Sequence, residues 1–128
     1  MHKNSKIYIA GHKGMVGSAI NRALINEGYT NIIGRSSKEL DLRNQDAVNK
    51  FLSLEKPDII IDAAAVVGGI LANNQYPYEF LMSNMQIQNN LINAAHQFSV
   101  KKFIFLGSSC IYPKFASQPI KEDSLLTN

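Results

Sequence analysis

The sequence predicts an α/β fold, in which a doubly wound parallel sheet of about four strands carries helices on both faces. Short apolar runs rich in β-branched residues alternate along the chain with longer stretches whose apolar residues recur at helical spacing. Parallel strands joined by helical crossovers require helices on both faces of the sheet. The chain has 128 residues, of which 45% are hydrophobic, so it can form one core and has little material for a second domain.

The first two expected strands flank the first expected helix. Residues 6–10 form a short apolar run that stops at Gly11, and residues 31–34 form a second run. The helix between them begins at Gly14 and ends at Gly28, because glycine is typical of helix C-termini. Its apolar residues at helical spacing are Val16, Ala19, Ile20, Ala23 and Leu24.

A second helix and a third strand follow. The Asn44 side chain can cap this helix, which must end before Pro57. Residues 58–62 are the third strand, and they lead into the small-residue segment 63–65. The inner face of the helix is expected to consist of Ala47, Val48, Phe51 and Leu52.

The remaining part of the chain contains one long helix and one strand. After the pair Gly68-Gly69 we expect a polar loop up to Pro77, then the helix, and then a fourth strand at residues 102–106. The residues expected to face inward from this helix are Leu81, Met85, Leu91, Ile92, Ala95 and Phe98. The expected strand order is 3-2-1-4, which places the ligand crevice at the carboxyl ends of strands one and four.

The turn after the first strand predicts a dinucleotide site. Gly11 follows the strand directly, Gly14 opens the helix and Gly17 lies one turn inside it. Glycines here permit a tight turn and a close approach of backbone N–H groups to a pyrophosphate, which the helix N-terminus also attracts. The alternative is a tight turn with no ligand. The predicted contact residues in this Rossmann-type turn are Gly11, His12, Lys13, Gly14, Met15, Val16 and Gly17.

The end of the second strand favours NADP(H) over NAD(H). It reads Gly34-Arg35-Ser36 and has no carboxylate, whereas a carboxylate would accept hydrogen bonds from a ribose 2′-hydroxyl and repel a 2′-phosphate. Arginine can pair with that phosphate. We therefore expect Arg35, with Lys13 and also Lys38, to recognise the 2′-phosphate. The alternative for each of these cations is an ordinary solvated side chain.

Composition excludes several other classes of site. Cys110 is the sole cysteine, so the chain has no internal disulfide, and no Cys/His cluster has metal-ligand spacing. The net charge of +3 is dispersed, which argues against a nucleic-acid partner. The apolar runs are too short to cross a membrane, and the N-terminus lacks a signal-peptide core. We expect a cytoplasmic enzyme without a metal.

Several motifs together resemble a known enzyme family. These are the glycine turn at 11–17, the alanines at 63–65, the helix around Asn84 and the Ser-Ser-Cys-Ile-Tyr-Pro run at 108–113. They are similar to the extended short-chain dehydrogenase/reductases that modify nucleotide sugars. Within these, the runs at 11–20, 67–70, 72–74 and 108–114 resemble the GDP-L-fucose synthase family. That family epimerises GDP-4-keto-6-deoxy-D-mannose at C3 and C5 and then reduces C4 with NADPH. The similarity covers almost the whole chain.

The resemblance implies roles for individual residues. Asp41 and Leu42 would flank the adenine, Ala63, Ala64 and Ala65 would line the pyrophosphate and ribose, and Asn84 would lie near the nicotinamide. Ser108 would donate a hydrogen bond to the substrate C4 oxygen, and Cys110 would be the epimerisation base. The plainer alternatives are a turn residue for Asp41, residues of a crowded strand end for the alanines and a partner of buried backbone for Asn84. For Ser108 the alternative is a backbone cap, and for Cys110 it is a small buried thiol. The family carries a second basic residue where this chain has Ser37.

Other family features are missing from these residues. No tyrosine is followed by lysine four positions later, and neither the epimerase histidine nor a GDP-sugar domain can be placed. We therefore interpret residues 1–128 as the N-terminal part of an NADP(H)-binding domain, truncated at Asn128 and inactive alone, from an enzyme that is a homodimer when intact. The open alternatives are a 4-reductase of a related GDP-6-deoxy-4-keto sugar, such as a heptose, and a non-catalytic NADP-binding fragment.

Overall fold

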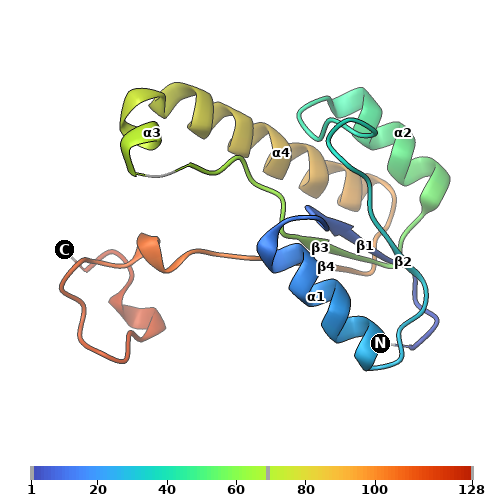
Figure 1. Ribbon diagram of the computed structural model, residues 1–128, viewed down its shortest axis with the longest axis horizontal. Helices are drawn as coiled ribbons and strands as arrows, with labels where there is room; N and C mark the ends of the chain where they lie inside the picture. Colours follow the sequence, from blue (N-terminus) through green and yellow to red (C-terminus); the bar gives the residue numbers. More distant parts are fainter. Residues whose placement is uncertain (1, 69, 128) are drawn as a thin grey trace.

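The computed structural model describes residues 2–68 and 70–127, so Met1, Asn128 and Gly69, the second glycine of the pair, lie outside the described residues. Four parallel strands form one sheet, with helices on both faces (Figure 1). The strands are β1 (Ile7–Ala10), β2 (Ile32–Ile33), β3 (Ile59–Asp62) and β4 (Lys102–Phe105). The helices are α1 (Met15–Asn26), α2 (Gln45–Glu55), α3 (Ile70–Gln75) and α4 (Pro77–Gln97), and two short 3₁₀ helices, η1 (Ser109–Ile111) and η2 (Glu122–Ser124), follow. The predicted α/β class is confirmed.

The predicted strand order, 3-2-1-4, is wrong. The observed order is β2-β1-β3-β4, and Ile7 in β1 pairs with Ile32 on one side and with Ile59 on the other. The reason is the handedness of the crossovers. Helix α1 lies on one face of the sheet, and α2 and α4 lie on the other (Figure 1). A right-handed connection from β2 through α2 therefore runs in the direction opposite to the one through α1, and it places β3 on the far side of β1 from β2. The switch point, and with it the crevice, therefore lies between β1 and β3 rather than beside strand four.

Two apolar clusters hold the helices to the sheet. On one face, Tyr8, Ala10 and Ile60 pack with residues of α2 and α4, including Leu52 and Leu91. On the other face, the remaining strand residues pack with α1; these are Ile7, Ile9, Ile59 and Ile61 from the strands and Ile20 and Leu24 from the helix. All residues of β1 and β3 are buried, which is typical of central parallel strands. The two central strands thus hold their carboxyl ends rigidly side by side.

The expected ends of α2 are confirmed. Asn44 caps the helix, because its Oδ1 accepts the Ala47 N–H at 3.1 Å. The helix stops at Lys56, whose backbone is left-handed at φ 46°, directly before Pro57. This termination places Glu55 at the last helical position, where its side chain reaches Arg35, two residues after β2.

The segment from Ile70 onward differs from the expectation in two ways. Helix α3 occupies residues for which a polar loop was predicted. In α4, Leu91 and Ala95 are buried as expected, but Leu81 and Met85 are exposed because the N-terminal half of the helix extends beyond the sheet (Figure 1). Ile92 is also exposed, on the side of α4 near the edge strand β4. Among the described residues, no helix is long and apolar enough to span a membrane.

Candidate dinucleotide site

The turn between β1 and α1 leaves no room for a side chain at Gly11 or Gly17. Gly11 has a φ of +78°, and a Cβ there would lie 2.6 Å from the Ala63 carbonyl oxygen. A Cβ on Gly17 would lie 2.0 Å from the Gly11 carbonyl oxygen. The glycines therefore allow β1, β3 and α1 to meet closely. Gly14 is the N-cap of α1 and has no side chain that could accept hydrogen bonds from the first N–H groups of the helix. These N–H groups are therefore available to an anion.

A cavity of about 540 Å³ lies at the carboxyl ends of β1 and β3, where the switch point places a ligand. Its wall contains many of the cofactor-binding residues predicted from sequence, namely Gly11, Gly14, Arg35, Asp41, Leu42, Ala63, Ala64 and Ala65. A neighbouring cavity of about 280 Å³ shares the three alanines and adds the predicted residues Val16 and Asn84. The structure thus brings together residues that are separated by up to about half of the chain.

Other predicted contact residues lie outside these two cavities. Lys13 and Met15 are exposed beside the turn, and Gly17 is buried behind it. The His12 ring packs directly against the backbone of Gly34. A Cβ on Gly34 would lie only 2.3 Å from His12 Cγ, so a larger residue would not fit there. The pKa of the nearby Glu39 carboxyl shows that Arg35 and Lys13 both contribute positive charge here. Hydrogen bonds with Ser36 lower this pKa most, and the charges of Arg35 and Lys13 lower it further. The two cations therefore act on the same region.

The wall of the larger cavity contains a residue that sequence reasoning missed, Arg43. Arg43 lines the larger cavity and pairs with Asp41, its Nε and Nη2 lying 3.1 and 3.2 Å from the two carboxylate oxygens. Hydrogen bonds from Arg43 lower the pKa of the Asp41 carboxyl. Opposite charges two residues apart were the available signal for this pair. The other lining residues that were not anticipated are Ser37, Leu40, Val66 and Ile87.

Asn84 uses its amide group on the backbone. Its Oδ1 accepts the Val66 N–H at 2.7 Å, and its Nδ2 donates to the Val66 carbonyl at 3.0 Å. Helix α4 thereby holds the segment that follows the three alanines. This is the backbone-satisfying alternative considered for Asn84, and a contact with the nicotinamide stays a prediction.

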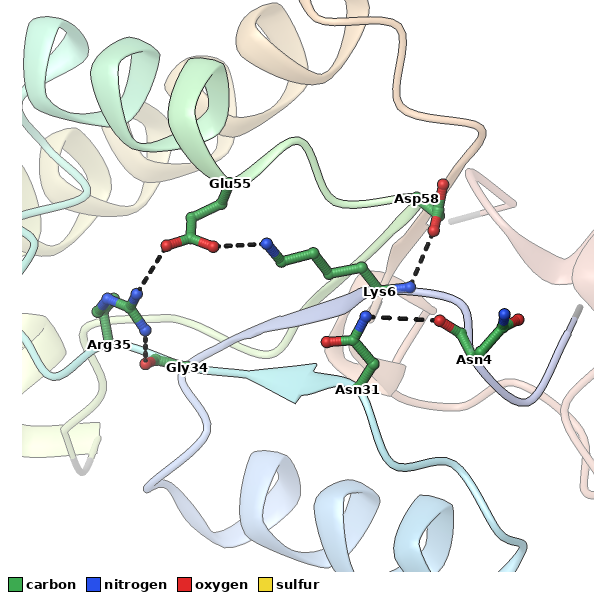
Figure 2. A network of polar contacts seen from close by, with 7 residues as sticks. All are labelled: Asn4, Lys6, Asn31, Gly34, Arg35, Glu55 and Asp58. Atoms are coloured by element: carbon green, nitrogen blue, oxygen red, sulfur yellow. Dashed lines mark hydrogen bonds and ion pairs between the residues drawn. The ribbon is translucent and has the colours of Figure 1, made fainter.

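Arg35 is held by a network of polar contacts at the end of β2 (Figure 2). Its Nη1 donates to the Gly34 carbonyl at 2.8 Å, and its Nη2 lies 3.0 Å from Glu55 Oε1. The guanidinium lies over the Phe51 ring, 5.2 Å from the centroid. Glu55 also binds Lys6 Nζ at 2.6 Å, and the hydrogen bond from Lys6, together with the charges of both cations, lowers the pKa of the Glu55 carboxyl.

Two buried side chains of the central strands, Asp62 and Tyr8, have a raised pKa. Asp62 ends β3 and is 4% exposed, with Oδ1 accepting the Ala64 N–H at 3.1 Å. Burial raises the pKa of the Asp62 carboxyl, and this hydrogen bond opposes the rise. Burial also raises the pKa of Tyr8, and the charge of Asp62 adds to that effect. Asp62 lines the smaller cavity, so its protonation state bears on the ligand site.

The predicted catalytic residues lie farther along the chain. Ser108 and Cys110 are exposed in the segment after β4, which extends away from the sheet (Figure 1). The Ser108 hydroxyl accepts the Cys110 N–H at 3.1 Å and so caps η1. The smaller cavity reaches Phe105 and Leu106 at the end of β4 and includes neither residue. Within residues 2–68 and 70–127, no cluster of His, Cys, Asp or Glu could hold a metal ion.

Comparison with known proteins identifies the protein family of this chain. Residues 7–128 match the family described as the NAD dependent epimerase/dehydratase family. The chain belongs to this family. Epimerase/dehydratase relatives in the curated proteins include GDP-L-fucose synthase 1 of Arabidopsis thaliana, which is 57% identical over 125 residues, or 98% of this chain. The chain spans 39% of the length of that relative.

Solved structures of similar proteins agree with the epimerase/dehydratase assignment. A GDP-mannoheptose C4 reductase from Campylobacter jejuni, solved with NADP bound, superimposes with a TM-score of 0.91 at 42% identity, covering 98% of this chain and 40% of that one. A GDP-L-fucose synthetase from Naegleria fowleri bound to NADP gives a TM-score of 0.85 at 29% identity, covering 98% and 38%. The Rossmann-type fold of this chain is therefore that of NADP-binding sugar-nucleotide enzymes.

Proposed function

We propose that this chain forms the NADP(H)-binding part of a GDP-L-fucose synthase, which converts GDP-4-keto-6-deoxy-D-mannose to GDP-L-fucose by 3,5-epimerisation and 4-keto reduction. The observation that carries the proposal is the cavity at the carboxyl ends of β1 and β3, which has Gly11, Gly14 and Arg35 in its wall. The identity to GDP-L-fucose synthases over nearly the whole chain supports the choice of substrate.

The residues present fit a dinucleotide. The space that a Cβ on Gly11 would fill is taken by the backbone of Ala63 and Ala64, directly after β3, and the uncapped N-terminus of α1 offers N–H groups and a positive dipole end to the pyrophosphate. Arg35 supplies a cation for the 2′-phosphate. Asp41 and Leu42 flank the adenine, and Ala63, Ala64 and Ala65 permit close approach of the ribose and pyrophosphate. NADPH, when bound, supplies the hydride for C4 of the sugar.

Ser108 and Cys110 act on the sugar in this proposal. The Ser108 hydroxyl donates a hydrogen bond to the C4 oxygen, which favours hydride addition to that carbon. The Cys110 thiolate removes the proton next to the ketone at C3 or C5. Since no tyrosine in residues 1–128 precedes a lysine by four positions, we do not assign the proton-donating step to this chain.

Calorimetry with NADPH and NADH tests the cofactor assignment. We expect NADPH to bind more tightly, because Arg35 and Lys13 contribute positive charge to the region that the 2′-phosphate would occupy. Tighter binding of NADH would reject the role given to these cations. If neither nucleotide bound, the cofactor site itself would be refuted.

A second candidate is a pure 4-reductase of a related GDP-6-deoxy-4-keto sugar, such as a heptose. The superposition on the C. jejuni heptose reductase favours it. Incubating the complete polypeptide with GDP-4-keto-6-deoxy-D-mannose in deuterated water, without NADPH, separates the two. Deuterium at C3 and C5 supports the epimerase, whereas its absence supports the reductase. Binding of NADPH without any turnover would leave only a non-catalytic NADP-binding module.

We also propose that the intact enzyme is a cytoplasmic homodimer. Leu81 and Met85 are exposed on α4, where a second subunit could cover them. Light scattering on the complete polypeptide measures its mass directly. A monomeric mass at micromolar concentration would contradict this part of the proposal.

A further inference from the structure

Glu55 lies outside the larger cavity but contacts a residue in its wall. As the last residue of α2, it bridges Lys6 Nζ at 2.6 Å and Arg35 Nη2 at 3.0 Å (Figure 2). Lys6 is itself fixed, because its N–H donates to Asp58 Oδ2 at 2.9 Å and its carbonyl accepts the Asp58 N–H at 2.8 Å. Glu55 is therefore held by Lys6, the residue directly before β1, while it holds Arg35.

Three contacts restrict the Arg35 guanidinium. The Glu55 carboxylate and the Gly34 carbonyl each accept one hydrogen bond, and the Phe51 ring covers one face. A guanidinium has five N–H donors, so these two hydrogen bonds leave others for a ligand in the cavity that Arg35 lines. The contacts thus fix the side chain without using all of its donors.

The charges of this group leave it attractive to an anion. Glu55 carries one negative charge between two cations, Lys6 and Arg35, so the three together remain positive. The side chains of Arg35 and Glu55 are 32% and 27% exposed, so their ion pair is partly shielded from water. Glu55 can therefore order Arg35 without cancelling the positive charge that a phosphate requires.

We propose that Glu55 is a positioning residue that presets Arg35 for the 2′-phosphate and so contributes to the selection of NADPH over NADH. This inference rests on the NADP(H) site proposed above. A free arginine side chain loses considerable rotamer entropy when a ligand fixes it. With Glu55 in place, much of that entropy is lost on folding, and phosphate binding no longer bears the cost.

Two substitutions that remove the same charge test the proposal. Glu55→Gln keeps an oxygen that can accept from Arg35, whereas Glu55→Ala removes it, so the comparison isolates positioning from electrostatics. Calorimetry on the complete polypeptide that carries this chain should give an NADPH dissociation constant about three- to tenfold higher for E55A than for E55Q. The NADH constants of the two variants should agree, because NADH has no 2′-phosphate.

Repeating the pair in an Arg35→Ala background provides the control. There, E55A and E55Q should bind NADPH equally, since the residue that Glu55 positions is gone. A persistent difference without Arg35, or equal NADPH binding with Arg35 present, would overturn the inference. If E55A does not fold, Glu55→Asp is compared with the unsubstituted protein instead, because both carry the same charge and Glu55→Asp draws the carboxylate away from Arg35; it should then raise the NADPH dissociation constant and leave that for NADH unchanged. Failure of the unsubstituted protein to prefer NADPH would instead refute the proposed function.

Discussion

Replacing Gly17 by alanine tests how closely α1 packs on the turn after β1. In most helices this change stabilises, because alanine has a helix propensity about 1 kcal/mol better than glycine. Here the new Cβ would lie 2.0 Å from the Gly11 carbonyl oxygen, 2.7 Å from its carbonyl carbon and 3.0 Å from His12 Cα. All three are backbone atoms, so the helix must move away from the turn.

The net cost follows from these opposing terms. Overpacking costs about 1–3 kcal/mol, and a contact this short with backbone belongs at or above the upper end. After the propensity gain is subtracted, we expect a loss of about 2 kcal/mol in the free energy of unfolding. The displaced helix N-terminus should also weaken NADPH binding by about tenfold, equivalent to about 1.4 kcal/mol.

Gly14→Ala is the matched control in the same turn. A Cβ on Gly14 would lie 3.4 Å from the Gly11 carbonyl oxygen, at the border of ordinary contact, and Gly14 has no positive φ. Its effect on stability should stay within about 1 kcal/mol, the cost typical of an N-cap change. Urea unfolding followed by circular dichroism measures both variants in the complete polypeptide. If G17A proved as stable as the unsubstituted protein, the close packing inferred for this turn would be wrong.

Three further substitutions have defined outcomes. Arg35→Leu should raise the NADPH dissociation constant about tenfold to a hundredfold by removing charged hydrogen bonds, while calorimetry with NADH detects little change; equal losses for both would contradict a phosphate-specific role. Asn84→Ala should lower the unfolding free energy by about 0.5–1.5 kcal/mol, because two solvent-exposed hydrogen bonds to the Val66 backbone are lost and water partly replaces them; unchanged urea midpoints would argue against this. Since the folded pKa of Asp62 is raised above 3.8, the folded state binds the extra proton, and stability falls as pH rises from 3.8 through the raised pKa. Asp62→Asn keeps the acceptor for the Ala64 N–H and should be more stable than the unsubstituted protein at neutral pH. This difference in unfolding free energy should disappear below pH 3.8. A difference that stays constant across that pH range would exclude the titration of Asp62 as the cause of the stabilisation.

The sequence alone was sufficient where the information is local. Strands were predicted at the positions of β1 and β3 because their apolar runs are continuous, and Asn44 was identified as a cap because capping involves residues three positions apart. The glycine turn belongs to the same class. Gly11 is required by a positive φ, and its place directly after a strand made the pattern interpretable.

The sequence did not reveal which faces of the sheet the helices cover. The order β2-β1-β3-β4 depends on α1 and α2 lying on opposite faces, because a right-handed crossover then reverses its direction. Helical spacing also could not reveal that α4 extends past the sheet, which leaves Leu81 and Met85 exposed. Periodicity identifies an apolar face, whereas burial depends on whether another element is present to cover it.

The candidate site divides in the same way. The interpretation of the glycine turn as a dinucleotide site, the cationic residue Arg35 and the small residues after β3 all come from local pattern and charge, so they could be predicted from the sequence. Tertiary structure alone decided that Glu55, twenty residues from Arg35 in the chain, holds its guanidinium, and that Asn84 binds the backbone of Val66. Such contacts join segments that are distant in the sequence. Which residues become partners depends on how whole helices pack on the sheet, and this packing cannot be predicted from a short stretch of sequence.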